Sequence, residues 1–330
     1  MVDGEFCARE ISGPFRITGP DSVAHHAERV VPKHILRRFW LRTPTIIRAF
    51  LTSLAVAAAS SIPWAILAKA NLRYLNSMPW AVVPTALYMW FFWRYIRGHG
   101  WPQSTAMYRR ENSRANPLSP DVWGAALIAG ILGLAAVVLL LRIVTRLVAL
   151  PTESTAELSR VPAITLAGLV VMGAVVAGIG EESSFRGYLQ RPIERRHGPA
   201  IAILITGCLF SLAHLSHLEV TIALLPYYVA VAAVYGLLAY LTDSILPSMV
   251  LHIGGNILGS IDLLTTGRSE WQTKSSTAQL IWETGTDSSF WISCALFLLV
   301  TIAAFVAYLS LARAAKARPS PAANSLGNSR

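Results

Sequence analysis

The chain has few charged residues for its size. Asp, Glu, Lys and Arg make up 14% of its 330 residues, whereas ordinary globular domains carry about 25%. Hydrophobic residues reach 54%, so too few polar side chains remain to cover a water-facing surface. This composition excludes a soluble cytosolic enzyme, a disordered scaffold and a protein that binds nucleic acid, and it indicates a polytopic membrane protein.

Cysteine is also scarce. Cys7, Cys208 and Cys294 are odd in number and far apart, so they match no metal-binding spacing and indicate no redox compartment. We expect no cleavable signal peptide, because a polar segment of 45 residues with many arginines precedes the first apolar run. That segment is typical of a cytoplasmic tail.

Long apolar runs, in contrast, are abundant. A helix needs about 20 apolar residues to cross the hydrocarbon core of a bilayer, and we therefore expect an all-α bundle of about eight transmembrane helices. The expected spans are residues 46–68, 78–96, 122–141, 162–180, 199–216, 220–241, 245–260 and 290–312. The expected organisation is a cytoplasmic tail (1–45), three spans with a hydrophilic connector (46–161), a core (162–260), a polar loop with the last span (261–312) and a disordered tail (313–330).

The distribution of basic residues predicts the orientation of these spans. If eight spans alternate from a cytoplasmic N-terminus, 21 of the 28 Lys and Arg residues fall in cytoplasmic segments. Cytoplasmic loops of membrane proteins carry such an excess. We therefore expect an integral membrane protein with both termini in the cytoplasm, in contact with membrane lipid.

A first polar cluster, Glu181-Glu182-x-x-x-Arg186, closes the fourth apolar run. Residues four apart share a helical face, so Glu182 and Arg186 can pair while Glu181 points about 100° away. The cluster is either an interfacial ion pair or a site in which Glu181 serves as a general base. A straight helix over residues 162–196 would be about 52 Å long, too long for one span, and we expect a break near Gly178-Ile-Gly180.

Two further clusters contain histidine. Phe210-x-x-x-His214 ends the fifth run, and His252-x-x-x-Asn256 places an imidazole and an amide on one helical face. Each alone is typical of hydrogen-bonded packing residues, but ionisable groups inside a membrane favour function. Gly254 and Gly255 predict close approach of a neighbouring helix or of a substrate to this face. His217, which follows His214 and precedes Glu219, is expected to be interfacial.

Taken in order, these motifs and the approach Thr242-Asp243-Ser244-Ile245-Leu246-Pro247-Ser248 resemble the CPBP family of intramembrane proteases. That family includes CAAX prenyl endopeptidases of the Ras-converting type and bacterial bacteriocin-processing and immunity-associated proteins. The resemblance covers about residues 162–260, with Asp243 where family members more often carry a small residue. Because the family includes bacterial members, we expect the chain in a bacterial plasma membrane.

The resemblance implies a role for each motif residue. Glu181 and His214 would activate a water molecule, while His252 and Asn256 would stabilise the tetrahedral oxyanion, as peptide hydrolysis requires. Supporting residues of this site would be Glu182, Arg186 and Phe210. Members are described both as metalloproteases and as glutamate proteases. If zinc binds, its ligands would be Glu181, His214 and His252; the H-E-x-x-H motif is absent, and we expect no obligatory metal.

The leading hypothesis is therefore an intramembrane endopeptidase that cuts a membrane-associated or lipidated protein or peptide, in CAAX-type or propeptide processing. A scaffold or immunity protein of the same fold is the first alternative. An ion-coupled transporter, which would use the same polar residues as a relay, is the second, although the sequence has no inverted repeat.

Overall fold

The computed structural model describes residues 40, 42–149, 161–214, 222–266 and 280–317. These residues are almost entirely helical and contain no strand, which confirms the all-α bundle. Within the unit Thr45–Arg330, the helical elements are α2 (Thr45–Tyr74), α3 (Val82–Ile96), η2 (Gln103–Thr105), α4 (Ala106–Ser113), α5 (Pro120–Leu147), α6 (Ala163–Glu181), η4 (Glu182–Gln190), α7 (Arg191–His197), α8 (Pro199–Ala213), α10 (Leu225–Thr242), α11 (Leu246–Thr266), α13 (Ile281–Thr284) and α14 (Ser288–Lys316).

A helix is present at each of the eight apolar runs. Five helical segments are long and apolar enough to cross a membrane, namely α2, α5, the continuous helix Ala163–His197, α10 and α14. The other three expected spans correspond to the 15-residue helices α3 and α8 and to α11. These helices fit an integral membrane protein, and the number of eight crossings stays a prediction.

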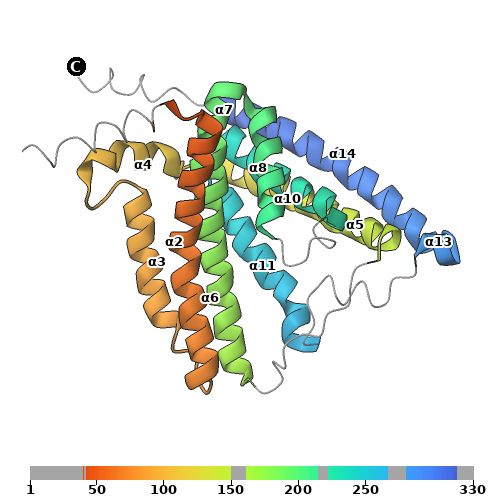
Figure 1. Ribbon diagram of the computed structural model, residues 1–330. Helices are drawn as coiled ribbons and strands as arrows, with labels where there is room; N and C mark the ends of the chain where they lie inside the picture. Colours follow the sequence, from red (N-terminus) through yellow and green to blue (C-terminus); the bar gives the residue numbers. More distant parts are fainter. Residues whose placement is uncertain (1–39, 41, 150–160, 215–221, 267–279, 318–330) are drawn as a thin grey trace, which may run out of the picture. The chain divides into compact units, whose positions relative to one another are not determined.

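The helices pack around the short element η4. Helices α2, α3 and α6 lie side by side, while α14 runs along α5 (Figure 1). Helix α11 packs against α6, and α10 packs against α8 and α5. Since η4 contacts α2, α4, α7, α8 and α10, its nine residues are all buried. The polar motif of residues 181–186 therefore enters the centre of the bundle.

The outward helix faces are apolar rather than polar. Large hydrophobic side chains are exposed on α2, α3 and α14, among them Leu54, Val83 and Leu298. Exposed apolar surface of this extent is unfavourable in water but suits contact with lipid chains. The structure thus follows the low charge content of the sequence, because these faces need no polar covering in a bilayer.

The expected break at Gly178-Ile-Gly180 is wrong. The helix continues from Ala163 to His197, and it changes to π-helical geometry only at η4. The glycines serve packing instead: a Cβ atom on Gly178 would lie 2.3 Å from Ile253 of α11, and one on Gly180 would lie 2.2 Å from the Oγ atom of Ser60 of α2. The excess length is taken up by α7, whose last turn is basic and extends beyond the apolar stretch.

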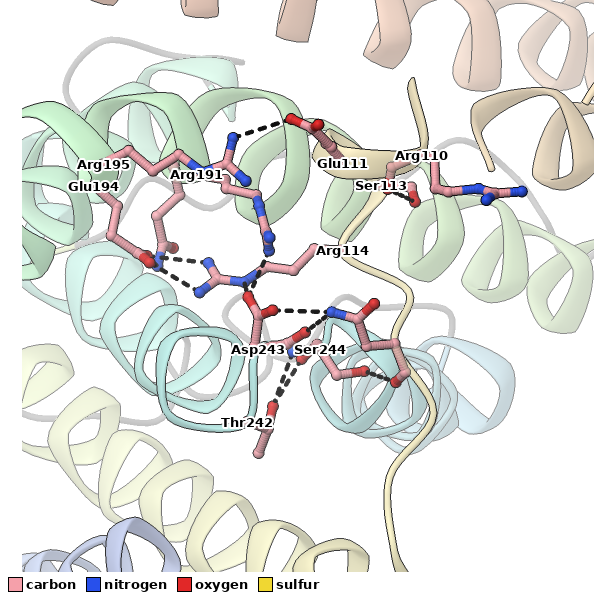
Figure 2. A network of polar contacts seen from close by, with 12 residues as sticks. Arg110, Glu111, Ser113, Arg114, Arg191, Glu194, Arg195, Thr242, Asp243 and Ser244 are labelled. Carbon is pink, nitrogen blue, oxygen red and sulfur yellow. Dashed lines mark hydrogen bonds and ion pairs between the residues drawn. The ribbon is translucent and has the colours of Figure 1, made fainter. Parts of the chain in front are cut away.

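An ion-pair network fastens the segment between α3 and α5 to the rest of the bundle (Figure 2). Arg114 forms two hydrogen bonds with Glu194 of α7, at 3.0 and 2.9 Å, and one with Asp243 at 3.0 Å. Asp243 also accepts hydrogen bonds from Arg191 and Asn116. These contacts join α4, α7 and the turn between α10 and α11. They therefore fix the start of α11, the helix that carries His252.

Asp243 departs from the small residue that the resemblance leads one to expect, and the network gives a physical reason. Its φ angle is +49°, a left-handed conformation that aspartate tolerates better than most residues. Its carboxylate accepts from Arg114 and Arg191. The side chain at this turn therefore supplies the negative charge that the two arginines share.

Candidate active site

The centre of the candidate site is the pair Glu182 and Arg186. Their side chains are both fully buried, and Arg186 Nη1 lies 3.1 Å from Glu182 Oε1. The guanidinium group also lies over the rings of Phe210 and Tyr235, at 4.9 and 5.2 Å from the ring centroids. Aromatic faces stabilise a cation where water is excluded. Residues 182 and 186 thus pair as their spacing predicts, and Phe210 lies against the cation.

Glu182 also holds His252, a contact that the sequence spacing does not reveal. The Nδ1 atom of His252 lies 2.8 Å from Glu182 Oε1, and the imidazole ring stacks on Tyr235 with 5.1 Å between centroids and 12° between planes. Because an ionised carboxylate only accepts hydrogen bonds, Nδ1 donates. The other ring nitrogen, Nε2, lies 3.7 Å from Glu181 Oε2.

Glu181 occupies the accessible side of this cluster. Its side chain is 25% exposed, whereas that of Glu182 is fully buried. It lines a cavity of about 470 Å³ between α2, η4 and α8. Within the part of the chain that the structure describes, its Oε2 atom has no hydrogen-bond partner. Two adjacent carboxylates therefore differ in role: Glu182 is bound within the protein, and Glu181 faces the cavity.

His214 lies at the C-terminal end of α8 and lines the same cavity as Glu181. Its Nδ1 atom lies 2.8 Å from the backbone oxygen of Phe210. Since a carbonyl oxygen only accepts, Nδ1 is the donor, which leaves Nε2 as the acceptor of the neutral ring. The ring is held between Phe210, at 4.5 Å between centroids, and Tyr228, at 4.8 Å and an interplanar angle of 27°.

Tyr228 is a residue that the motifs did not indicate. It lies in the first turns of α10, stacks on His214 and interacts electrostatically with Glu181. It therefore packs directly on His214, one of the two groups that face the cavity. A tyrosine in an apolar helix has the same pattern as a packing residue, so the sequence offers no signal for it.

Asn256 is placed less centrally than the other three residues. It is half-buried on α11, one turn after His252, and its backbone oxygen accepts a hydrogen bond from Ser260. It does not line the 470 Å³ cavity. A Cβ atom on Gly254 would meet nothing within 4 Å, and one on Gly255 would only touch the Tyr235 hydroxyl at 3.7 Å. Among the described residues no neighbouring helix packs closely at these glycines, and the alternative, close approach of a substrate, stays a prediction.

The remaining sequence expectations concern metal and the two neighbouring residues. No group of three His, Cys, Asp or Glu side chains among the described residues is arranged to hold a metal ion. The set Glu181, His214 and His252 does not form such a group. His217 and Glu219 lie outside the described residues.

Comparison with known families agrees with the motifs. Residues 163–258 match the family model described as Type II CAAX prenyl endopeptidase Rce1-like. The matched segment contains all three polar clusters and amounts to less than a third of the chain. This match confirms the resemblance to the CPBP family. No curated protein and no solved structure matches the chain.

Proposed function

We propose that the chain is an intramembrane endopeptidase that hydrolyses a peptide bond in a membrane-associated or lipidated protein or peptide. The observation that carries this proposal is the position of Glu181. Its carboxylate lies 3.7 Å from His252 Nε2 and lines a cavity that His214 also lines, within the segment that matches the endopeptidase family.

Glu181 and His214 are assigned to the activation of water. The Oε2 atom of Glu181 has no hydrogen-bond partner among the described residues. The carboxylate can therefore accept a proton from a water molecule, whose oxygen then attacks the carbonyl carbon of the peptide bond. The Nε2 atom of neutral His214 can accept a hydrogen bond from the same water. The proton on Glu181 passes to the amine when the peptide bond breaks, which leaves the carboxylate as it began.

His252 and Asn256 are assigned to the oxyanion. Because Nδ1 of His252 donates to Glu182, Nε2 donates to an oxyanion only when it carries a second proton. Glu182 balances the positive charge of that protonated ring, and Arg186 in turn balances Glu182. The amide of Asn256 supplies a second donor at the open end of this face. Glu182, Arg186 and Phe210 are thus supporting residues.

Tyr228 is assigned as a positioning residue. Its ring packs flat against His214 and limits rotation of the imidazole about its last torsion. The hydrogen bond from His214 Nδ1 to the backbone oxygen of Phe210 also restricts this ring. Together these contacts fix the orientation of the His214 ring. Its Nε2 atom can then accept a hydrogen bond from the attacking water without a loss of alignment.

The walls of the cavity favour a substrate with an apolar segment or a lipid chain. Phe50, Leu54 and Ile62 of α2 and Leu212 of α8 line the cavity, and all four are exposed on the outer surface of the bundle. In a bilayer this rim meets hydrocarbon, so a substrate can enter sideways from the lipid. A CAAX-type lipidated peptide and a membrane-bound propeptide both have this character.

Substrate proteomics tests the proposal. Membranes from cells that produce the wild-type protein should contain cleaved fragments that are missing with Glu181→Gln and present with Glu283→Gln. Glu283 is an exposed carboxylate on α13, so it controls for the loss of a charge. Equal fragment patterns in all three membranes, with equal protein levels, would favour the alternative of a non-catalytic scaffold or immunity protein.

The expected orientation forms part of the proposal, with both termini in the cytoplasm of a bacterial cell. Reporter fusions after residues 20, 150, 275 and 325 test it. Cytoplasmic signals are expected at 20 and 325 and external signals at 150 and 275, because 21 basic residues then lie inside. A cytoplasmic signal at 150 or 275 would reject this topology.

A further inference from the structure

Another cavity, which shares no lining residue with the candidate active site, lies in the segment between α3 and α5. Its volume is about 200 Å³. The residues that line it are Arg97, His99, Arg110, Ser113, Ala115, Asn116 and Pro117. Two arginines, a histidine and two small polar side chains surround this space, and no carboxylate lines it. Its lining is therefore suited to an anion.

The arginines of this cavity differ from the other arginines of the same segment. The guanidinium group of Arg109 is occupied by hydrogen bonds within the protein, because it donates to the backbone oxygens of residues 95, 99, 100 and 102. Arg114 is bound by Glu194 and Asp243. Arg97 and Arg110 pair with no described carboxylate, and both are exposed. The segment from residue 97 to residue 119 contains one acidic residue, Glu111, which pairs with Arg195 instead.

Hydrogen bonds within the protein hold the backbone around the cavity in place. The bonds from Arg109 hold the turn at residues 95–102 in shape, and Asn116 is fixed by two bonds from its side-chain amide to Asp243. Figure 2 shows Arg110 extending away from the ion pairs of Arg114, with Ser113 between them. Arg110 is thus held at its backbone while its charged group points away from the acidic side chains.

Independent features place this cavity at the level of lipid headgroups. It begins where α3 ends, and α3 exposes apolar side chains along its length. Arg97 lies over Trp93, and Arg94 lies over Trp90. In the otherwise polar segment that follows, Trp101 is 84% exposed. Tryptophan with neighbouring arginine is enriched where hydrocarbon meets headgroups.

We propose that this cavity binds the phosphate group of an anionic membrane lipid. Planar guanidinium groups match phosphate oxygens with paired, charge-assisted hydrogen bonds. A substrate carboxylate does not fit as the occupant. Asn116 of the cavity is linked through Asp243 to Arg191, the first residue of α7, and Arg191 lies ten residues beyond Glu181, about 15 Å along the helix. The last three residues of a peptide cut at Glu181 reach only about 10 Å. The proposal does not depend on protease activity.

Lipid titration tests this site. The full-length protein in phosphatidylcholine nanodiscs is titrated with short-chain phosphatidylglycerol, and bound lipid is counted by native mass spectrometry. Arg97→Gln/Arg110→Gln should weaken phosphatidylglycerol binding by about 10- to 30-fold, because each arginine near an anionic headgroup contributes about 1 kcal/mol. Short-chain phosphatidylcholine, whose choline neutralises the phosphate, should not compete.

A matched control removes the same charge elsewhere. Arg73→Gln/Arg142→Gln changes two exposed arginines that do not line the cavity, so it should leave the affinity within about twofold. An equal loss in both double variants would overturn the proposal, since diffuse attraction would then explain binding. Inorganic phosphate that competes at the same concentration as phosphatidylglycerol would overturn the lipid assignment. Arg110→Gln alone, which disturbs no described ion pair, should give about a fivefold loss.

Discussion

Two arginines, Arg186 and Arg114, are almost equally inaccessible, at 0% and 2% exposed side chain, but their surroundings differ. Arg114 satisfies its guanidinium group with three hydrogen bonds to two carboxylates. Arg186 has one carboxylate at 3.1 Å and aromatic rings on its faces, and its nitrogens make no hydrogen bond of good geometry with described residues.

The two surroundings suit different roles. A fully bonded arginine near the polar end of the bundle stabilises the arrangement of three elements. A buried pair with incomplete bonding costs desolvation energy that it does not recover, so fold stability alone does not account for it. We propose that the pair instead supplies a fixed charge behind His252, which Glu182 contacts at 2.8 Å.

The largest expected effect is that of Arg186→Met. It leaves Glu182 as an uncompensated charge inside the bundle, and loss of one partner of a buried pair typically costs about 3–5 kcal/mol. The yield of folded protein should fall sharply, as measured by size-exclusion chromatography in detergent. Adding Glu182→Gln should restore much of that yield but no activity. Normal yield for Arg186→Met would show that the pair contributes little to the fold.

Asn256→Ala should act on turnover instead. Loss of one oxyanion donor typically lowers kcat by about 100- to 1,000-fold, and the side chain makes no hydrogen bond within the described residues whose loss would unfold the bundle. Ser260→Ala on the same helix, which removes a bond to the Asn256 backbone, is the control and should remain active. Comparable activity of both variants against a cleaved substrate would remove Asn256 from the proposed site.

Much of the fold could be predicted from the sequence because it depends on local patterns. Apolar runs gave the helices, and the four-residue spacing of Glu182 and Arg186 gave their pair. The contact of Glu182 with His252 spans 70 residues, and no spacing rule fixes which helices meet. The packing of Tyr228 on His214 was missed for the same reason.

The glycines show where local reasoning was wrong. Gly178 and Gly180 suggested a break, since glycine weakens helices. In the bundle α11 and α2 pack so closely against α6 at these positions that a Cβ atom would clash. Glycine has both uses, and only the neighbouring helices decide between them. The roles of Glu181, His214, His252 and Asn256 stay predictions, because proximity alone does not establish chemistry.

A smaller effect on turnover is expected for Tyr228, because its aromatic ring, and not its hydroxyl group, contacts His214. Tyr228→Leu removes a stacked pair worth about 0.5–1.5 kcal/mol, so we expect kcat to fall by about 2- to 10-fold with KM unchanged. Tyr228→Phe keeps the ring and should retain most of the activity. If Tyr228→Phe is as slow as Tyr228→Leu, the hydroxyl group acts directly and the positioning role is wrong.

Asp243→Ala tests the network without touching the site. It removes a charged acceptor from Arg114 and Arg191, and a lost charge-assisted hydrogen bond costs about 1–3 kcal/mol. The Tm in detergent should fall while the activity per folded molecule stays constant. Asp243→Asn tolerates the positive φ angle, so it separates the loss of charge from backbone strain and should be milder. A selective loss of activity would show that the network controls the site.

The smallest effect should come from the rim of the same network. Glu111 and Arg195 lie 3.4 Å apart, but their side chains are 49% and 51% exposed. Water and salt screen such a pair, which is typically worth about 0–1 kcal/mol. Glu111→Gln should therefore change Tm less than Asp243→Asn does, and this small change should vanish at high salt. A larger, salt-insensitive change would mean that the two charges are shielded from water in the membrane-bound protein, and that the network reaches further than Arg114.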